Sequence, residues 1–390
     1  MPNIPVDGCC GCTACANICP VNAIRMTADR EGFLYPQIDE HKCISCSQCE
    51  NVCPVLNPPV ISDAYTGVVV AQSMRPDALR ECTSGGFVDA LNYYATEVKK
   101  GFAVGVAFDD DFMPVHTIAD TYEKAKAFRN SKYAQSNLGD IFPKITQLLD
   151  QGDFVVFTGT PCQVAGLNAF LRKPYDNLLT VDLVCRSVPS PRFWREYLKW
   201  QEKKHKQKIL SVACRRKTYG YHSGALEIRF DQGKKYAGSN RVDYFMKAFH
   251  KDICSRPSCY GCAFKNRHRC SDFTVFDSWC PEQVTCEAMK DNDRGYSNVI
   301  AHTEKALGTL EKVENIKTIP ADAEKMFQFT GGMEQYSVSR PAVRDVFYAS
   351  LEECGFEKTV TKYVSVSGKD RLIEAAKPIW FGLKRMLKGY

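Results

Sequence analysis

Two copies of one cysteine motif lie within the first 54 residues and constrain the fold more than any other feature of the chain. The motif is C-x2-C-x2-C-x3-C-P, and each of its cysteines recurs at one constant offset. Runs of this kind ligate paired [4Fe-4S] clusters, and the fourth cysteine of each run ligates the cluster of the other run. The prediction for one cluster is Cys9, Cys12, Cys15 and Cys53, and for the other Cys43, Cys46, Cys49 and Cys19.

Zinc knuckles and disulfides are the alternatives for these eight cysteines. Structural zinc sites pair CxxC units and do not use this longer run, which ends in Cys-Pro. Residues 1–58 resemble a bacterial two-cluster ferredoxin, with a short strand expected over 33–38. Cys10 offers a second register for the first motif, but only Cys9 keeps both two-residue spacings.

The composition limits the class of protein. A chain of 390 residues with 20 cysteines is too long for a small disulfide scaffold and suggests roughly two to three domains. It begins with no basic and apolar leader and has no apolar run of about 18 residues, so we expect a soluble cytoplasmic protein. The net charge of +6 suggests a nucleic-acid binder. Because each four-thiolate cluster adds about two negative charges, we expect no nucleic-acid partner.

The rest of the chain alternates between strand and helix patterns. Short apolar runs predict strands over 66–72, 102–108, 154–157 and 178–184. Helices are expected over 87–100 and 164–171, and another helix is expected to end at 147–150. The predicted fold class is α+β or α/β, with a two-cluster ferredoxin-like N-terminal domain, a mixed-sheet flavin-binding core and a helical C-terminus.

Four segments follow from these patterns. They are a ferredoxin domain over 1–58, a flavin-binding part over 62–194, a part containing a CxxC pair over 195–338, and a helical segment over 339–390. Within the last segment, Pro378 suits the first position of an amphipathic helix. Packing on its own domain is the usual role of such a helix, and docking to a membrane or a partner protein is the alternative.

A flavin is the cofactor that an iron–sulfur module fused to a large body suggests, since flavins accept single electrons and pass them on in pairs. The turns TSGG (83–86) and TGTPCQ (158–163) precede helices, where backbone N–H groups can approach a ligand. For the first turn, a plain capped helix is an equal alternative. KYAQS (132–136) adds a cation, a ring and a hydroxyl. The candidate cofactor-binding residues are Thr83, Ser84, Gly85, Gly86, Lys132, Tyr133, Gln135, Ser136, Thr158, Gly159 and Thr160.

Several blocks occur in the order seen in one family. They are SGG (84–86), KYAQS (132–136), VVFTGTPCQVAGL (155–167), VDLVC (181–185), PSP (189–191) and RPSCYGCAFKNRHRCSDFTVFDSW (256–279). Over roughly residues 5–340 the chain resembles the coenzyme F-420 hydrogenase/dehydrogenase beta-subunit family, here fused to an N-terminal ferredoxin. The resemblance implies an FAD-containing iron–sulfur oxidoreductase, some relatives of which pass hydride to the deazaflavin coenzyme F-420.

The resemblance also implies a third [4Fe-4S] cluster, with Cys162, Cys185, Cys259 and Cys262 as ligands. Cys162 and Cys185 come just after predicted strands, at the carboxyl ends where the strands of one sheet converge. A local [2Fe-2S] or zinc site at Cys254, Cys259, Cys262 and Cys270 is one alternative, and plain buried thiols are another.

Two departures from the family pattern bear on the substrate. Cys185-Arg186-Ser187 replaces Cys-His-Gly, and Phe276-Asp277-Ser278-Trp279-Cys280 replaces Gly-Asp-Phe-Trp-Gly. Larger side chains narrow a cavity, so we expect a substrate other than coenzyme F-420 as readily as F-420 itself.

The sequence therefore predicts an iron–sulfur flavoprotein oxidoreductase that exchanges hydride with an organic acceptor and electrons with a redox partner protein, such as a ferredoxin or a dehydrogenase subunit. An electron-transfer subunit without its own substrate site is the alternative, and a binding module with structural metal sites is a third. No residue is assigned a catalytic role. His116, His222 and Lys132 are the candidate proton donors.

Overall fold

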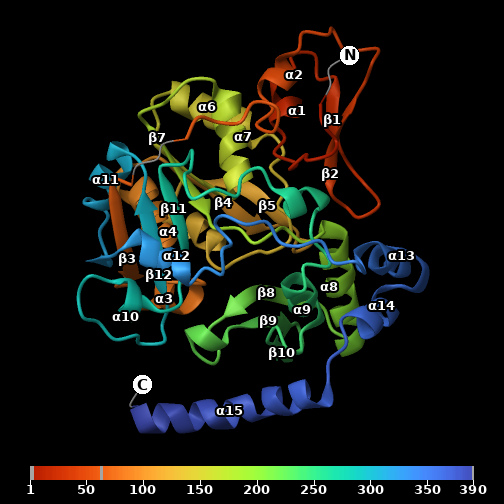
Figure 1. Cartoon of the computed structure of the whole chain (residues 1–390), viewed down its shortest axis with the longest axis vertical. Coiled ribbons are helices and arrows are strands. Elements are labelled where there is room, and N and C mark those ends of the chain that lie inside the picture. The colour runs from red at the N-terminus through yellow and green to blue at the C-terminus, as the bar shows by residue number, and fades with distance from the viewer. Residues whose placement is uncertain (1–3, 62–64, 389–390) are drawn as a thin grey trace.

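The computed structural model describes residues 4–61 and 65–388, with side chains described as far as Leu383. Within these residues, a mixed sheet has the strand order β13-β3-β12-β11-β7-β6-β4-β5 (Figure 1). The strands are β3 Gly67–Ser73, β4 Phe102–Phe108, β5 Pro114–Ala119, β6 Val155–Gly159, β7 Leu178–Leu183, β11 Phe273–Ser278, β12 Tyr296–Ala301 and β13 Ile316–Pro320. The four central strands β4, β6, β7 and β11 run parallel, and the outer pairs are antiparallel. The expected mixed-sheet core is confirmed.

Helices cover both faces of this sheet, which explains why β6 is buried at every position. Val156 of β6 faces α4 (Phe87–Tyr93), whereas Val155 and Phe157 face α6 (Ile141–Asp150) and α7 (Pro161–Leu171). Strands β3, β4, β6, β7 and β11 run in the same direction, so their carboxyl ends meet at one edge of the sheet. In such sheets this edge is where ligands bind.

The N-terminal segment contains α1 (Ala14–Ile18), the hairpin of β1 (Ile24–Ala28) with β2 (Leu34–Ile38), and α2 (Gln48–Asn51). It packs beside α7 (Figure 1). Cys12, Ala14 and Val52 share one apolar core with Phe142 and Leu167. The cysteine motifs are therefore fixed against the main sheet rather than carried on a separate body.

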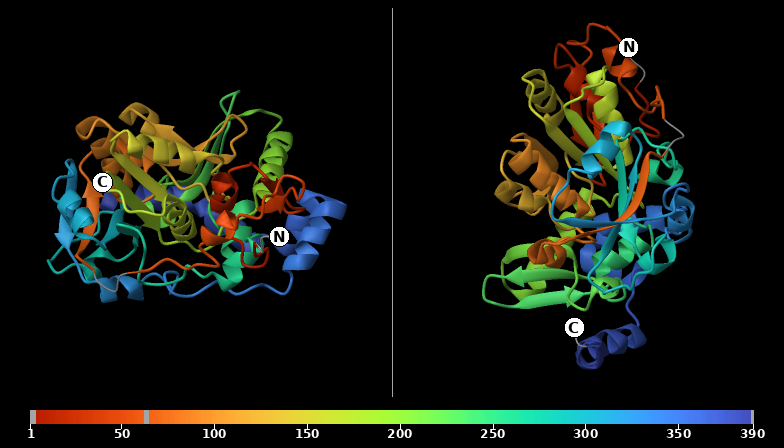
Figure 2. Two further views of the ribbon diagram at one scale, coloured as in Figure 1. Left: turned by 90° about the horizontal axis from the view of Figure 1, so that it is seen from above. Right: turned by 90° about the vertical axis from the view of Figure 1, so that its left-hand side faces the viewer.

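A second, antiparallel sheet has the order β10-β9-β8, formed by β8 (Ile209–Arg216), β9 (Ala225–Phe230) and β10 (Lys235–Gly238). An aromatic core joins it to α8 (Pro191–His205), α9 (Tyr244–His250), α13 (Arg344–Cys354) and α14 (Phe356–Tyr363). Figure 2 shows this unit on the side of the main sheet away from the N-terminus. The remaining α-helices of the described residues are α3 Pro76–Glu81, α5 Tyr122–Ala125, α10 Pro281–Val284, α11 Glu304–Leu310, α12 Ala323–Gln328 and α15 Gly368–Lys388.

The predicted helices differ from the observed ones mainly at their ends. The helix expected over 87–100 is α-helical to Tyr93 and continues as a π-helix over Tyr94–Val98. The helix expected from residue 164 begins at Pro161, which suits a first helical position. The placement of Pro378 at a helix start is wrong, because it lies inside α15. That helix starts earlier because Ser367 and Asp370 cap each other's backbone N–H groups.

Candidate redox centre at the carboxyl edge of the sheet

The first N-terminal set of thiols is brought together by the crossing of the two motifs. Burial, together with the neighbouring thiols of Cys9 and Cys53, raises the pKa of Cys15 to about 12. Cys53, from the second motif, therefore lies beside Cys15 of the first, as expected if the fourth cysteine crosses over.

The second N-terminal set shows the reciprocal crossing. A small cavity is lined by Cys43, Cys46 and Cys49 of the second motif and by Cys19 of the first. The Sγ of Cys19 also accepts a hydrogen bond from the Ala23 N–H at 3.2 Å. Cys46 is exposed, whereas Cys49 is buried, so this set lies at the protein surface.

Four more cysteines from three elements converge at the carboxyl edge of the main sheet. Cys162 lies in the first turn of α7, Cys185 follows β7, and Cys259 and Cys262 flank the end of a 3-10 turn, Pro257–Gly261. Burial raises the pKa of Cys185, and the thiols of the other three raise it further. The pKa of Cys259 is raised to about 12 by burial and then by Cys262 and Cys162. The structure thus brings together all four residues expected to hold a third cluster.

The local alternative is not assembled. Cys254 is fully buried in the aromatic core, where Asp252 and Arg344 are its charged neighbours. Cys270 lies beside Asp182 and Arg269 instead. In the described part of the chain, no three Cys, His, Asp or Glu side chains converge as tightly as a single metal ion requires. A four-iron cluster is a wider body than one ion, and the four convergent thiols are the number of ligands that it requires.

Buried thiols with raised pKa values bind their protons firmly, and metal ligation requires that these protons leave. Cationic side chains near the four convergent thiols favour the thiolate form. Arg256 opposes the rise in the pKa of Cys162 that its hydrogen bond with Cys10 and burial cause, and Lys265 opposes the rise that burial causes at Cys185 and Cys262. Lys265 Nζ also donates to the backbone carbonyl of Cys185. The donor set and its charges fit an iron–sulfur cluster.

Helix α7 connects this group to the first N-terminal set. Cys162 and Gly166 are one turn apart, and a Cβ on Gly166 would lie 2.7 Å from the Cβ of Cys12 and 3.0 Å from its Sγ. Cys10 lies between the two groups, since its thiol contacts those of both Cys12 and Cys162. These contacts place the first N-terminal set beside the four convergent thiols.

Arg256 holds the N-terminal loop in this position. Its buried guanidinium donates to the carbonyls of Cys9 at 2.8 Å and Leu34 at 2.9 Å, and to Oε1 of Gln135 at 2.9 Å. Gln135 in turn donates to the Cys10 carbonyl. Gln135 was expected to contact a flavin, but in this structure it fastens the cysteine loop.

The first expected flavin turn, 83–86, uses its polar groups within the protein. Thr83 Oγ1 accepts from the Ser131 N–H, and Ser84 Oγ donates to the Tyr296 carbonyl at 2.6 Å. A Cβ on Gly85 would lie 2.3 Å from the Ala71 carbonyl oxygen, so this glycine allows close strand packing. Gly86 has a φ of +83° and precedes α4.

The other expected flavin residues lie nearby and are mostly engaged. Lys132 Nζ donates to three backbone carbonyls, and burial lowers its pKa to about 8. Ser136 accepts from Gln163, and Thr160 bonds with Gln163 and Cys162. A Cβ on Gly159 would meet Phe157 and Gln163 at 3.1 and 3.2 Å. Thr158 Oγ1 is buried without a hydrogen-bond partner.

Near Tyr133, buried polar atoms without hydrogen-bond partners mark a candidate ligand site that the sequence motifs did not indicate. Arg215 Nη2 and Asp277 Oδ1 are buried without hydrogen-bond partners at the carboxyl end of β11. The Arg215 guanidinium lies 4.5 Å from the centre of the Trp279 ring, and Tyr133 adjoins Arg215. Donors, acceptors and flat rings at one place fit a heteroaromatic ring such as a flavin. Arg215 belongs to no motif that would have identified it.

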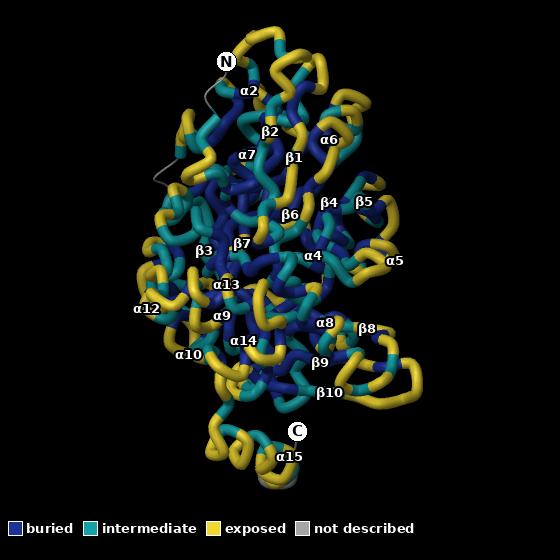
Figure 3. The backbone as a smooth tube through the Cα atoms, turned by 90° about the vertical axis from the view of Figure 1, so that its right-hand side faces the viewer, coloured by how far each residue is buried: buried dark blue, intermediate teal, exposed yellow. Residues whose placement is uncertain are grey.

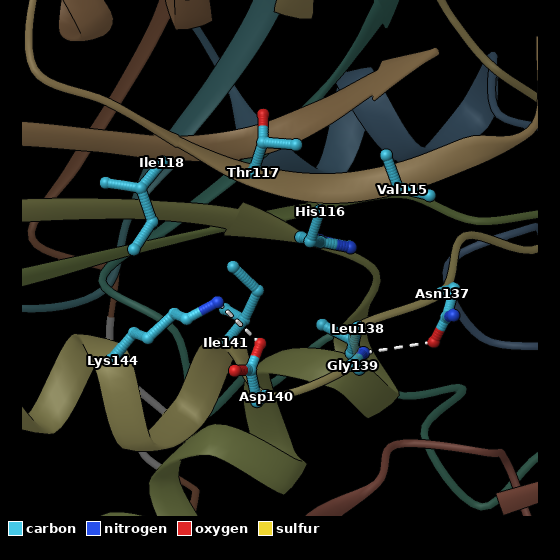
Figure 4. A pocket seen from close by; sticks show the side chains of 10 residues that line it. All are labelled: Val115, His116, Thr117, Ile118, Asn137, Leu138, Gly139, Asp140, Ile141 and Lys144. Carbon is cyan, nitrogen blue, oxygen red and sulfur yellow. Dashed lines mark hydrogen bonds and ion pairs between the residues drawn. The ribbon is translucent and has the colours of Figure 1, made fainter. Parts of the chain in front are cut away.

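Of the candidate proton donors, His116 is the most deeply buried. Burial lowers the pKa of His116 to about 4, and its ring stacks on Phe157 at 5.5 Å. It lines a cavity of about 420 Å³ between β5 and α6, with Asn137 and Lys144 on the same cavity (Figure 4). That cavity includes neither the convergent thiols nor any expected flavin residue. His222 contacts Asp291 at 2.5 Å.

The departures from the family pattern also have clear positions. Arg186 pairs with Asp252 at 2.6 Å and is partly exposed. Asp277 accepts from Arg215, and Trp279 stacks with Tyr221 at 5.0 Å between ring centres. The cation that replaces the family's histidine is therefore held by a carboxylate.

Known protein families match both the segment with the N-terminal cysteine motifs and the segment with the four convergent thiols. Residues 8–57 match the 4Fe-4S dicluster domain, and residues 152–325 match the C terminus of the coenzyme F420 hydrogenase/dehydrogenase beta subunit. No curated protein matches the chain. A chain of the F420-reducing [NiFe] hydrogenase complex from Methanosarcina barkeri, solved as a xenon derivative, aligns with 18% identity and a TM-score of 0.46, covering 78% of this chain and 94% of that one. The chain therefore joins a segment that matches the 4Fe-4S dicluster domain to one that matches the C terminus of the coenzyme F420 hydrogenase/dehydrogenase beta subunit.

Proposed function

We propose that this chain is an iron–sulfur flavoprotein oxidoreductase, in which three groups of four cysteines hold [4Fe-4S] clusters beside an FAD site. The observation that carries the proposal is the convergence of Cys162, Cys185, Cys259 and Cys262 next to the first N-terminal set of thiols. Twelve thiolates in a connected arrangement are the ligands that three such clusters require.

The depth of the three cysteine groups below the surface indicates where a partner protein would make contact. Cys46 is exposed, and the Cys43, Cys46, Cys49 and Cys19 set lies at the surface. The Cys9, Cys12, Cys15 and Cys53 set is next, and the convergent thiols are deepest in the protein. A redox partner protein would therefore contact the surface around Cys46.

Arg215 and Asp277 would hold the flavin ring, with Tyr133 and Trp279 beside it. Bound FAD exchanges electrons singly with iron–sulfur centres and in pairs, as hydride, with organic molecules. The Arg215 guanidinium stabilises negative charge there, and the Asp277 carboxylate keeps the guanidinium in place.

Anaerobic purification followed by iron, sulfide and flavin counting tests this proposal. We expect about twelve irons and one FAD per chain, and about eight irons in Cys259→Ser. Cys286→Ser is the matched control, because Cys286 is exposed and outside the three groups. About eight irons in the unsubstituted protein, or an unchanged iron count in Cys259→Ser, would contradict the third cluster.

An electron-transfer subunit without its own substrate site is the second candidate. It is favoured by the engagement of Lys132, Gln135 and Ser84 in hydrogen bonds within the protein, which leaves fewer groups for a ligand. Protein that holds three clusters, lacks FAD after incubation with it, and reduces a dye but no organic acceptor would support this candidate over the first.

A further inference from the structure

Helix α15 presents apolar side chains to solvent. Leu372 is 74% exposed, Ile379 is 70% exposed and Leu383 is 54% exposed. Their spacing of seven and then four residues places them on one face of the helix. Trp380, next to this face, is 61% exposed. A helix at the surface of a globular protein ordinarily turns such a face inward.

The opposite face of α15 fastens the helix to the protein through polar bonds and through Phe381, whose ring contacts Tyr219. The Glu374 carboxylate accepts from the Ser239 N–H at 2.9 Å and from the Ser239 hydroxyl at 2.6 Å. Asp370 accepts from Lys247 at 3.2 Å. Burial opposes ionisation of Glu374, but the bonds from Ser239 and Lys377 outweigh it and lower its pKa. The orientation of the helix is therefore set by specific bonds.

The charge of the segment complements an anionic surface. Residues 368–388 contain six Lys or Arg and two Asp or Glu. The two acidic residues are the ones that bond to the protein body, whereas Lys369 and Arg371, which both precede Leu372, are exposed. An apolar face with cations around it is typical of helices that lie in a membrane interface.

The position of α15 leaves this face accessible. It lies along the end of the molecule opposite the N-terminal segment (Figures 1 and 2), and Figure 3 shows it as an outlying helix with exposed and half-buried positions. None of the described helices has an apolar stretch long enough to cross a bilayer.

We propose that α15 docks this protein on the surface of a membrane that contains anionic lipids, with Leu372, Ile379 and Leu383 buried at the level of the headgroups. In this orientation the cysteine motifs point away from the membrane, where a protein partner can reach them. The inference stands on the exposure, bonding and charge of α15 and does not depend on the proposed redox function.

Co-sedimentation of the full-length protein with vesicles tests the proposal. We expect binding to phosphatidylcholine vesicles that contain phosphatidylglycerol, and weaker binding to pure phosphatidylcholine or in high salt. Ile379→Ser with Leu383→Ser should lower the partition coefficient roughly tenfold or more. The matched control is Leu210→Ser with Val346→Ser, which removes two other exposed apolar side chains and should leave binding unchanged. Circular dichroism establishes that each variant is folded.

A charge variant separates the electrostatic part of the attraction to the membrane from the apolar part. Lys369→Gln with Arg371→Gln should weaken binding to the anionic vesicles and flatten its salt dependence. Equal vesicle binding by the Ile379 and Leu383 variant, or no binding by the unsubstituted protein, would overturn the proposal. So would a lipid-free dimer that this variant abolishes, since the apolar face would then belong to a second copy of the chain.

Discussion

Arg344 on α13 pairs with Glu31, in the turn between β1 and β2, although 313 residues separate them. Both side chains are almost fully buried, and one guanidinium nitrogen lies 2.9 Å from the carboxylate. Arg344 also donates to the Ser255 carbonyl, four residues before Cys259. One guanidinium therefore connects the N-terminal hairpin, the CxxC turn and a C-terminal helix.

Removing this guanidinium should destabilise the whole protein. Arg344→Met leaves the Glu31 carboxylate buried without its partner, and we expect a loss of about 3–5 kcal/mol in the free energy of unfolding. Urea denaturation followed by circular dichroism measures this loss. Arg340→Met is the control, because Arg340 pairs with Asp345 at the surface and should cost about 1 kcal/mol or less. Similar losses in the two variants would contradict a stabilising role for the buried pair.

Gly166 should control the contact between α7 and the first motif. Gly166→Ala places a methyl group 2.7 Å from the Cβ of Cys12, so we expect displacement of Cys12 and loss of about four irons. Iron analysis and electron paramagnetic resonance measure the loss. Gly308→Ala in α11 is the matched control: its Cβ meets nothing within 4 Å, and the change should stabilise the helix by about 0.5–1 kcal/mol. Full iron content with an unchanged spectrum in Gly166→Ala would show that the packing tolerates the methyl group.

His116 should make stability fall in mild acid. Burial lowers its pKa from 6.5 to about 4, so the unfolded chain binds a proton in this range that the folded protein does not. The contribution of neutral His116 to the free energy of unfolding is fully present above pH 6.5 and is lost as the pH falls towards 4. Between pH 7 and pH 5 the loss is about 2 kcal/mol. Denaturation at the two pH values should show a smaller decrease for His116→Phe than for the unsubstituted protein. Exposed His41→Asn serves as the control, and equal decreases in all three proteins would refute the assignment.

Arg215 should matter for flavin retention if the proposed site is right. Arg215→Lys keeps the charge beside Asp277 but removes the unpartnered Nη2, so we expect roughly tenfold weaker FAD binding. Fluorescence titration of deflavinated protein measures the affinity. Arg229→Lys, at a largely exposed arginine, is the comparison. Equal affinities would remove Arg215 from the site.

Local patterns were sufficient for much of the fold. The strand over Phe102–Phe108 was predicted with its observed bounds, because a short apolar run bounded by glycine and aspartate has few other structures available. The predicted start of the helix that contains Pro378 was too late, because the Ser367 and Asp370 cap is a weaker sequence signal than a proline. The crossing of the two cysteine motifs followed from their spacing alone.

The site around Arg215 could not be predicted in the same way. Arg215, Asp277 and Trp279 come from different sheets and meet only when β8 and β11 approach each other. Their significance lies in buried atoms without partners, which no residue pattern reveals. The roles of Gln135 and Gly85 were likewise set by packing, because both contact segments distant in the sequence.

The placement of Cys162 and Gly166 on successive turns of α7 has a consequence for how this protein can change over evolution. Four residues of α-helix span only about 6 Å and bring both positions to the same side. A single inserted residue between them would rotate one by about 100° relative to the other. Insertions and deletions should therefore be tolerated in the loop after α7, but not between these two positions.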